Sequence, residues 1–161
     1  MHKIVISNTS PIFYLNKIGH LELLKRLYGE IVIPRAVLEE LEDGRKAGED
    51  APEVSNYEWI KVRSVSLPYY IKIIPDLGKG EAEVLALGLE EGHLIIIDDA
   101  LARRIASLYS LKFTGTAGIF LKAKKEGLIK EIKPILNTLK DSGFFLKDKF
   151  LADIIKLAGE G

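Results

Sequence analysis

An uninterrupted apolar run from Leu94 to Ile97 is followed at once by two acids, Asp98 and Asp99. A short β-branched run of this kind predicts a strand, and a strand without polar alternation is buried on both faces. Such strands belong to parallel sheets that helices cover on both sides. At least one of the two carboxylates therefore lies at the end of a buried strand, where an isolated charge is costly unless a cation is near.

Strand-like and helical segments alternate along the rest of the chain. Further strands are predicted at residues 3–7, 31–33, 59–63 and 112–114, and helices after Pro11 and Pro34, from Gly78, and at residues 101–108, 116–125, 129–140 and 149–157. The strand at 59–63 alternates like an edge strand, residues 43–50 resemble a loop or a frayed helix end, and Gly92 is expected to end the helix that starts at Gly78. This order predicts an α/β fold with three α/β/α layers around a mainly parallel, twisted sheet.

Bulk composition narrows the class of protein. With 161 residues, of which 47% are hydrophobic and 29% charged, the chain is expected to fold as one domain over residues 1–161. It has no cysteine, which excludes disulfides, thiolate metal sites and a cysteine nucleophile. Twenty-three basic residues balance 23 acidic ones, so any nucleic-acid contact must come from local patches. The pattern of a signal peptide and an apolar run of about 20 residues are missing, so we expect a soluble, cytoplasmic protein without membrane partners.

Polar residues follow several of the predicted strands. In a parallel sheet the functional crevice lies outside the carboxyl ends of the strands, and the residues expected there are Asn8, Asp98, Asp99 and Thr114. Glu81 opens the helix that leads back into the strand at 94–97, so it is expected at the same edge. Glu40 lies on the helix after the second strand and can lean over that edge. The acids are therefore expected to converge.

Separated carboxylates without cysteine or histidine ligands suit Mg²⁺, or similarly Mn²⁺, better than Zn²⁺. Such ions can activate water and stabilise the charge of a phosphodiester during hydrolysis, which indicates RNA or DNA as substrate. A second interpretation stays open, because acids are also common at helix starts, where Glu81 or Asp99 could simply cap. Other acids are expected on solvated helix faces: Glu39, Glu42, Glu83 and Glu90.

Five segments, at residues 4–11, 33–41, 77–83, 97–103 and 114–116, together resemble the PIN domain, and in particular the small prokaryotic branch described as predicted nucleic-acid-binding proteins. The resemblance covers nearly the whole chain. It implies a fold like the nuclease domains of flap endonucleases, and three or four acids that hold Mg²⁺ or Mn²⁺ for ribonuclease or nuclease activity. It also implies a toxin neutralised by a small antitoxin, and a homodimer.

The resemblance also assigns residues to roles. By position, the acids of the family fall on Asn8, Glu40, Glu81 and Asp99, with Asp98 adjacent, and the hydroxyl after its last strand falls on Thr114 or Thr116. Asn8 departs from the pattern, because an amide presents a neutral oxygen where the family has a charged ligand. We expect weakened, Mn²⁺-favoured activity. The alternative is a non-catalytic PIN-like module that binds nucleic acid or protein.

Several basic and apolar side chains have two interpretations. Arg103 and Arg104 could contact substrate phosphate or form salt bridges with nearby acids. A basic helical face could be solvated or could steer RNA, and consists of Lys122, Lys124, Lys125 and Lys130. An apolar stripe belongs either to the core or to a dimer face, and consists of Leu21, Leu24 and Leu27.

Overall fold

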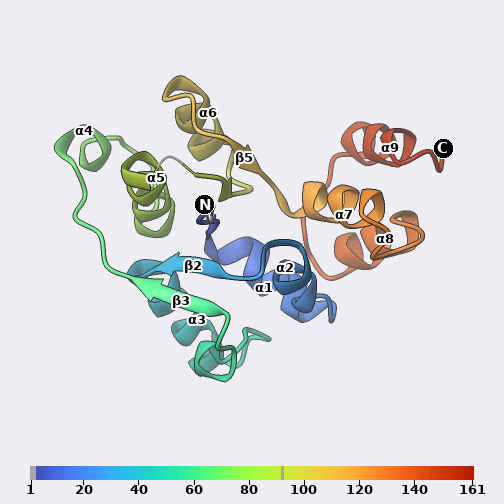
Figure 1. The fold of residues 1–161 in the computed structure, drawn as a ribbon, viewed down its shortest axis with the longest axis horizontal. Helices are drawn as coiled ribbons and strands as arrows, with labels where there is room; N and C mark the ends of the chain where they lie inside the picture. Colours follow the sequence, from blue (N-terminus) through green and yellow to red (C-terminus); the bar gives the residue numbers. More distant parts are fainter. Residues whose placement is uncertain (1–2, 92) are drawn as a thin grey trace.

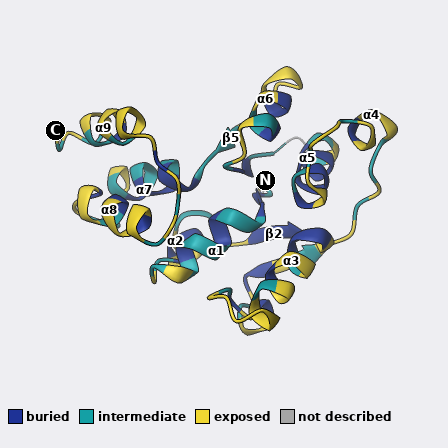
Figure 2. Ribbon diagram, turned by 180° about the vertical axis from the view of Figure 1, so that it is seen from behind, coloured by how far each residue is buried: buried dark blue, intermediate teal, exposed yellow. Residues whose placement is uncertain are grey.

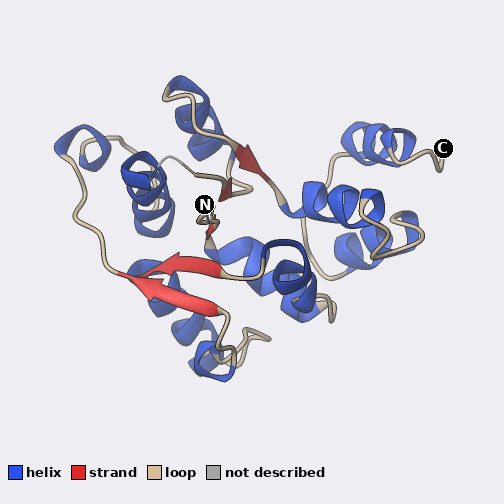
Figure 3. Cartoon of the chain, in the orientation of Figure 1, coloured by secondary structure: helices blue, strands red, loops and turns tan. Residues whose placement is uncertain are grey.

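A computed structural model describes residues 3–91 and 93–161, so the helix end predicted at Gly92 lies outside the described residues. A five-stranded sheet with the order β3-β2-β1-β4-β5 forms its centre, and each neighbouring pair of strands is parallel (Figures 1 and 3). The strands are β1 (Ile6–Ser7), β2 (Ile31–Pro34), β3 (Ile60–Arg63), β4 (Ile95–Ile96) and β5 (Phe113–Thr114). The predicted parallel α/β sheet is confirmed.

Helices flank the sheet. They are α1 (Thr9–Lys17), α2 (Glu22–Tyr28), α3 (Arg35–Lys46), the 3-10 turn η1 (Val54–Asn56), α4 (Tyr69–Lys72), α5 (Lys79–Glu91), α6 (Ala100–Leu108), α7 (Thr116–Lys125), α8 (Lys133–Asp141) and α9 (Asp148–Leu157). Helices α3 and α5 pack against each other and against β2, while α2 packs against β2 and α7, and α7 against α1. This arrangement is the expected α/β/α architecture. Helices α7, α8 and α9 gather at the end of the molecule opposite to α4 (Figure 1).

The central strands are buried on both faces, as their sequence predicts. Ile6, Ile95, Ile96 and Ile97 are fully shielded from solvent. Strand β2 is buried throughout and is coloured as buried in Figure 2. Fully burying one such side chain contributes about 1.5–3 kcal/mol. Strand β3 lies at the sheet edge and alternates between buried and exposed residues, which confirms the predicted edge strand. Within the described ranges, no helix has the length and apolar content that crossing a membrane requires.

Some predicted boundaries are wrong. Helix α3 continues to Lys46, so the start of the segment 43–50, predicted as a loop or a frayed helix end, is helical; its charged residues lie on an exposed face that water can solvate. Helix α4 is a single turn after Pro68, too short to produce a periodic pattern. Helix α8 begins at Lys133 rather than near residue 129. Leu21 and Leu24 are buried in the hydrophobic core and Leu27 packs against it, so this apolar stripe belongs to the core and not to a dimer face.

The strand order explains where the polar residues meet. Strand β1 lies between β2 and β4, and the order of the strands reverses there, which creates a topological switch point at the carboxyl edge. Asn8 follows β1, Asp98 and Asp99 follow β4, and Gly115 follows β5. The crevice expected of such folds therefore opens beside Asn8.

Candidate active site

Asn8 lies at the centre of this edge. Its backbone N–H donates to the Ile96 carbonyl over 2.9 Å, which continues the pairing of β1 with β4 beyond the strand end. The residue is only 5% exposed, and its Oδ1 is buried without a hydrogen-bond donor among residues 3–91 and 93–161. A buried acceptor without a partner costs about 1–3 kcal/mol. Asn8 Oδ1 is therefore suited to accept a donor or a cation from outside the chain.

Gly80, in the first turn of α5, allows Glu40 to approach Asn8. A Cβ atom on Gly80 would lie 3.1 Å from Asn8 Oδ1 and would collide with the Glu40 carboxylate. Only a residue without a side chain leaves room for both groups there. Thr9 also orients Glu40, since its hydroxyl donates to Glu40 Oε1 over 2.8 Å. Glu40 and Asn8, which are 32 positions apart in the chain, thus face the same point.

Negative charge accumulates around Glu40. Burial raises the pKa of the Glu40 carboxyl, the hydrogen bond from Thr9 lowers it, and the charges of Glu81 and Glu83 raise it further. None of these three glutamates forms an ion pair with a described residue, and the nearby Lys79 pairs instead with Glu39 at 3.9 Å. The glutamates form a group of like charges to which a cation would be attracted.

Glu83 is buried, and the prediction of a solvated position is wrong. It is 8% exposed, and its Oε1 accepts a hydrogen bond from the Ala36 backbone N–H over 3.0 Å. Ala36 lies in the first turn of α3, where N–H groups have no partner within the helix and the helix dipole favours a carboxylate. The flanking residues Ala82 and Val84 are buried too, and an acid inside a helix that is apolar on all sides is the sequence signal for this role.

Asp98 and Asp99 have different surroundings. Thr116 donates to Asp98 twice, from its backbone N–H over 2.8 Å and from its hydroxyl over 2.7 Å, and the Ser10 hydroxyl donates over 3.0 Å. Asp99 is exposed and caps α6 by accepting a hydrogen bond from the Ala102 N–H over 2.9 Å. Asp98 is thus rigidly oriented, whereas Asp99 has the capping role that the sequence left open. Asp99 uses only Oδ2 for this cap, which leaves Oδ1 for a ligand.

Two hollows meet at Asn8. The larger, of about 650 Å³, includes Asp98, Asp99 and Arg103 in its lining, and the smaller, of about 300 Å³, includes Glu40. The residues that line both are Asn8, Ser10, Tyr14 and Glu81. The structure thus brings the predicted acids to Asn8 from two sides.

The donor set fits a hydrated divalent cation. Within the part of the chain that the structure describes, no group of three or more acidic or histidine side chains is close enough together to hold a metal ion. Mg²⁺ does not require such a cluster, because it keeps several waters and binds through one or two carboxylates. The unpartnered Asn8 oxygen and the uncompensated charges of Glu40 and Glu81 provide hard oxygen ligands and a negative field. These residues therefore suit Mg²⁺ or Mn²⁺.

The remaining predicted site residues are Thr114, Thr116 and Arg103, and the structure gives them different surroundings. Thr116 is fully buried and uses its hydroxyl to hold Asp98, whereas Thr114 lines the larger hollow. Arg103 also lines it, with its guanidinium carbon 4.9 Å from the centre of the Phe113 ring. No ion pair of Arg103 is found within residues 3–91 and 93–161, so the salt-bridge alternative has no support there.

The basic face of α7 does not line either hollow at Asn8. Lys124 donates to the Ala158 carbonyl over 2.6 Å and to Glu160 over 2.8 Å, so its charge is used to attach the C-terminal segment. Lys122 lies over the Tyr28 ring at 4.5 Å and faces another hollow. Burial and the charge of Glu126 raise the pKa of Tyr28 to about 12. Lys122 and Lys124 therefore take no part in the lining of the acidic site.

Comparisons with known proteins agree with this architecture. The family model DUF3368, described as a PIN domain, matches residues 4–160. Among solved structures, the chain is similar to a PilT N-terminus domain protein from the hyperthermophilic archaeon Sulfolobus solfataricus P2. The TM-score is 0.56 and the identity 16%, over 74% of this chain and 92% of that chain. At this identity the likeness shows the fold alone. A search of curated proteins gives no match.

Proposed function

Because this chain belongs to the PIN-domain family, whose fold is nuclease-like, we propose that it is a ribonuclease that uses Mg²⁺ or Mn²⁺ to hydrolyse internal phosphodiester bonds. The observation that carries the proposal is the buried Oδ1 of Asn8, which has no described donor and lies at the meeting point of two acid-lined hollows. A buried polar atom of this kind is stabilised when a ligand completes its coordination.

Each site residue receives a role in this proposal. The cation would be held by the Asn8 amide oxygen and by one or two carboxylates from the set Glu40, Glu81, Asp98 and Asp99, with water completing its coordination. When bound, such an ion supplies an activated water and stabilises the charge of the phosphodiester. Thr9 orients Glu40, and Thr116 with Ser10 orients Asp98. Arg103, which has no ion-pair partner in the described ranges, would bind a phosphate oxygen, and Thr114 would position the strand.

The substitution Asn8→Asp tests the metal site. It adds a charge beside Glu40 and Glu81, so we expect a lower melting temperature without metal and a larger rise on adding Mn²⁺ than in the wild type. Mn²⁺ affinity, measured by calorimetry, should increase. Asn8→Ala is the matched control and should weaken Mn²⁺ binding. If Asn8→Asp leaves affinity and cleavage unchanged, this account of the site is wrong.

Activity is tested separately with a mixed RNA pool, incubated with Mn²⁺ or with EDTA. We expect weak cleavage with Mn²⁺, more cleavage by Asn8→Asp, and none with EDTA. A matched DNA pool tests the preference for RNA over DNA. Cleavage that persists in EDTA, or no cleavage by either protein, would contradict the nuclease proposal.

A second candidate function is a non-catalytic module that binds nucleic acid. Two observations favour it: position 8 carries a neutral amide, and Asp99 is engaged as the cap of α6. In this case Mn²⁺ and RNA would bind, but the RNA would stay intact in both metal and EDTA.

The remaining predictions concern partners. A homodimer and a small antitoxin are proposed on the basis of family membership. Light scattering of the purified chain tests the first. A short reading frame next to this one, whose product binds the chain and suppresses cleavage, would support the second.

A further inference from the structure

The larger hollow extends from the acids to a wall of aromatic and apolar side chains. This aromatic wall consists of Phe144, Phe145, Phe150 and Leu157. Phe145 is 79% exposed, Leu157 77% and Phe150 43%, although Asn8, Asp98 and Asp99 line the same hollow. Each large apolar side chain that stays in water lacks the stabilisation of about 1.5–3 kcal/mol that full burial would give. We propose that the aromatic wall is a subsite on which unpaired bases of a nucleic acid strand stack next to the bond that is cut.

The backbone of the wall is attached to the rest of the protein. The ring of Phe144 packs edge-to-face on Tyr14 of α1, with 5.1 Å between ring centres. Lys17, also in α1, donates from Nζ to the Ser142 carbonyl over 2.7 Å. Leu146 is 5% exposed and anchors the chain immediately after Phe145. Phe145 is therefore an exposed ring on a supported segment, which reduces the entropy lost when a base binds.

The position of Phe145 suits stacking. It lines the larger hollow and also a shallow hollow of about 420 Å³ that runs along Lys140 and Lys147. The ring thus stands between two depressions. A planar base has a π-face whatever its identity, and stacking on an aromatic side chain is worth about 1–3 kcal/mol per base.

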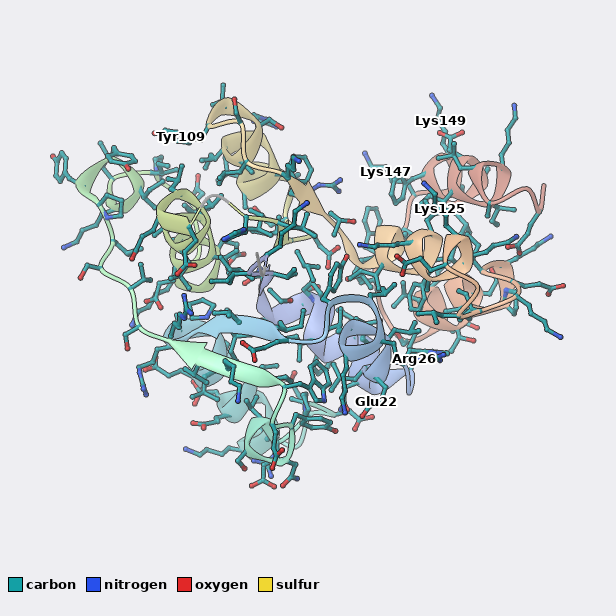
Figure 4. All side chains as sticks on the ribbon, viewed as in Figure 1. Glu22, Arg26, Tyr109, Lys125, Lys147 and Lys149 are labelled. Atoms are coloured by element: carbon teal, nitrogen blue, oxygen red, sulfur yellow. The ribbon has the colours of Figure 1, made fainter. Side chains whose placement is uncertain are left out.

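The charges around the wall favour a polyanionic strand. Arg103 lines the same hollow as the wall and the aspartates. Lys147 and Lys149 lie between Phe145 and Phe150 in the chain, at the start of α9 (Figure 4). These three cations form no ion pair within the described ranges. The acid between the two lysines, Asp148, is paired with Lys140 at 3.1 Å. Cationic groups that alternate with aromatic rings are the arrangement with which single strands are bound.

The inner end of the hollow argues against a protein helix as the occupant. An amphipathic helix would need apolar cover along its length, but the hollow continues into the polar side chains of Ser10, Asp98 and Asp99. A nucleic acid strand matches both halves, with bases on the rings and a phosphate at the acids. The inference rests on the proposed function, because the acids mark the place at which the phosphodiester bond would be cut.

Binding measured in EDTA tests the wall without requiring catalysis. The probe is a fluorescein-labelled single-stranded RNA of about 12 nucleotides, compared with the same length of blunt duplex and of abasic strand. We expect the wild type to bind the single strand more tightly than either comparison strand. Phe145→Ala and Phe150→Ala should each weaken single-strand binding by about 5- to 100-fold and leave abasic binding nearly unchanged.

Two further variants serve as controls. Tyr69→Ala removes an aromatic residue of similar exposure, 76%, in α4 at the far end of the molecule, and should bind like the wild type. Phe145→Trp keeps a stacking face and should retain affinity. Because Phe145 is mostly exposed, its variants should keep the wild-type circular dichroism spectrum and melting temperature.

The outcomes separate this inference from the proposed function. Equal loss of single-strand and abasic binding, or no loss in Phe145→Ala, would overturn the stacking subsite. Dimers that dissociate in Phe145→Ala while RNA binding is unchanged would also overturn it, because the wall would then be a protein interface. Ring-dependent binding without Mn²⁺-dependent cleavage would support the subsite and reject the nuclease.

Discussion

The buried Glu83 carboxylate accepts a hydrogen bond from the backbone N–H of Ala36 over 3.0 Å, and so connects α5 to the first turn of α3. Helix α5 carries Glu81 and α3 carries Glu40, the two glutamates expected to bind the cation. This hydrogen bond adds to the packing of α3 against α5, the two helices that carry half of the acidic site. Glu83 is a positioning residue, since it contacts backbone rather than lining either hollow at Asn8.

We expect Glu83→Ala to lower the free energy of unfolding by about 1–3 kcal/mol, because the Ala36 N–H loses its acceptor. Glu83→Gln keeps an acceptor oxygen and should be less destabilised. Urea unfolding near neutral pH measures both. Mn²⁺ affinity should also fall in Glu83→Ala and be largely kept in Glu83→Gln. Equal stability of the two variants would show that the hydrogen bond does not matter.

Gly80→Ala should disrupt the acidic site. Its Cβ would lie 3.1 Å from Asn8 Oδ1 and would collide with Glu40, which must then move. Loss of the contacts that orient metal ligands typically costs 10- to 100-fold in metal affinity, so calorimetry should show a loss on the order of 10-fold when Glu40 is pushed out of position. Gly44→Ala is the control: its Cβ meets no atom closer than 3.6 Å, and alanine should stabilise α3 slightly. Unchanged Mn²⁺ binding in Gly80→Ala would place the cation elsewhere.

Burial raises the pKa of the Glu40 carboxyl, and the hydrogen bond from Thr9 partly opposes that rise. This hydrogen bond lowers the pKa of a carboxyl that burial and neighbouring acids raise, so Thr9→Val should raise that pKa further. Because protons compete with metal for the carboxylate, Mn²⁺ affinity of the variant should begin to fall at a higher pH than in the wild type. Calorimetric titrations from about pH 7 downward measure this shift. The control is Thr138→Val, which removes a hydroxyl that donates to the Pro134 carbonyl within α8. This variant should leave the pH dependence of Mn²⁺ affinity unchanged.

Glu160 ties the C-terminal segment to the start of α8. Hydrogen bonds from the Ile132 N–H, Lys124 Nζ and the Lys133 N–H lower its pKa from 4.5 to about 2. A carboxyl whose pKa is lower in the folded than in the unfolded protein stabilises the fold at pH values above its unfolded pKa. This contribution disappears as the pH falls through its folded pKa.

Glu160→Gln should therefore melt at a lower temperature than the wild type at neutral pH, and the difference should shrink between about pH 4.5 and pH 2. Thermal unfolding followed by circular dichroism across this range measures it. Glu90→Gln, which changes an exposed acid of α5, should show no comparable trend. A constant difference at every pH would mean that the ionised carboxylate is not the stabilising form.

Part of the site could be predicted because strand ends have a defined position. The unbroken apolar run before Asp98 indicates a buried parallel strand, and the structure confirms a β4 that is shielded on both faces. Parallel strands place their carboxyl ends at one edge, so Asn8 and the two aspartates had to be neighbours. Glu40 is expected at the same edge because its helix follows the second strand, and the family resemblance then assigns it a role.

Other features depend on contacts between distant segments. Glu83 and Ala36 are 47 positions apart, and Asp98 and Thr116 are 18 apart. Hydrophobic periodicity describes only the faces of a single helix or strand. It could therefore not show that Glu83 accepts a hydrogen bond from α3 or that Lys124 pairs with Glu160.

The sequence by itself determined the alternation of elements, the burial of the central strands and the edge at which the polar residues gather, because these follow from local hydrophobic pattern and chain direction. Only the tertiary structure decided which acid is oriented by Thr116, which one caps α6, and which aromatic residues stay exposed beside them. The physical reason is that hydrogen-bond partners and exposure are set when helices pack against one another, after each helix is already specified by its own residues.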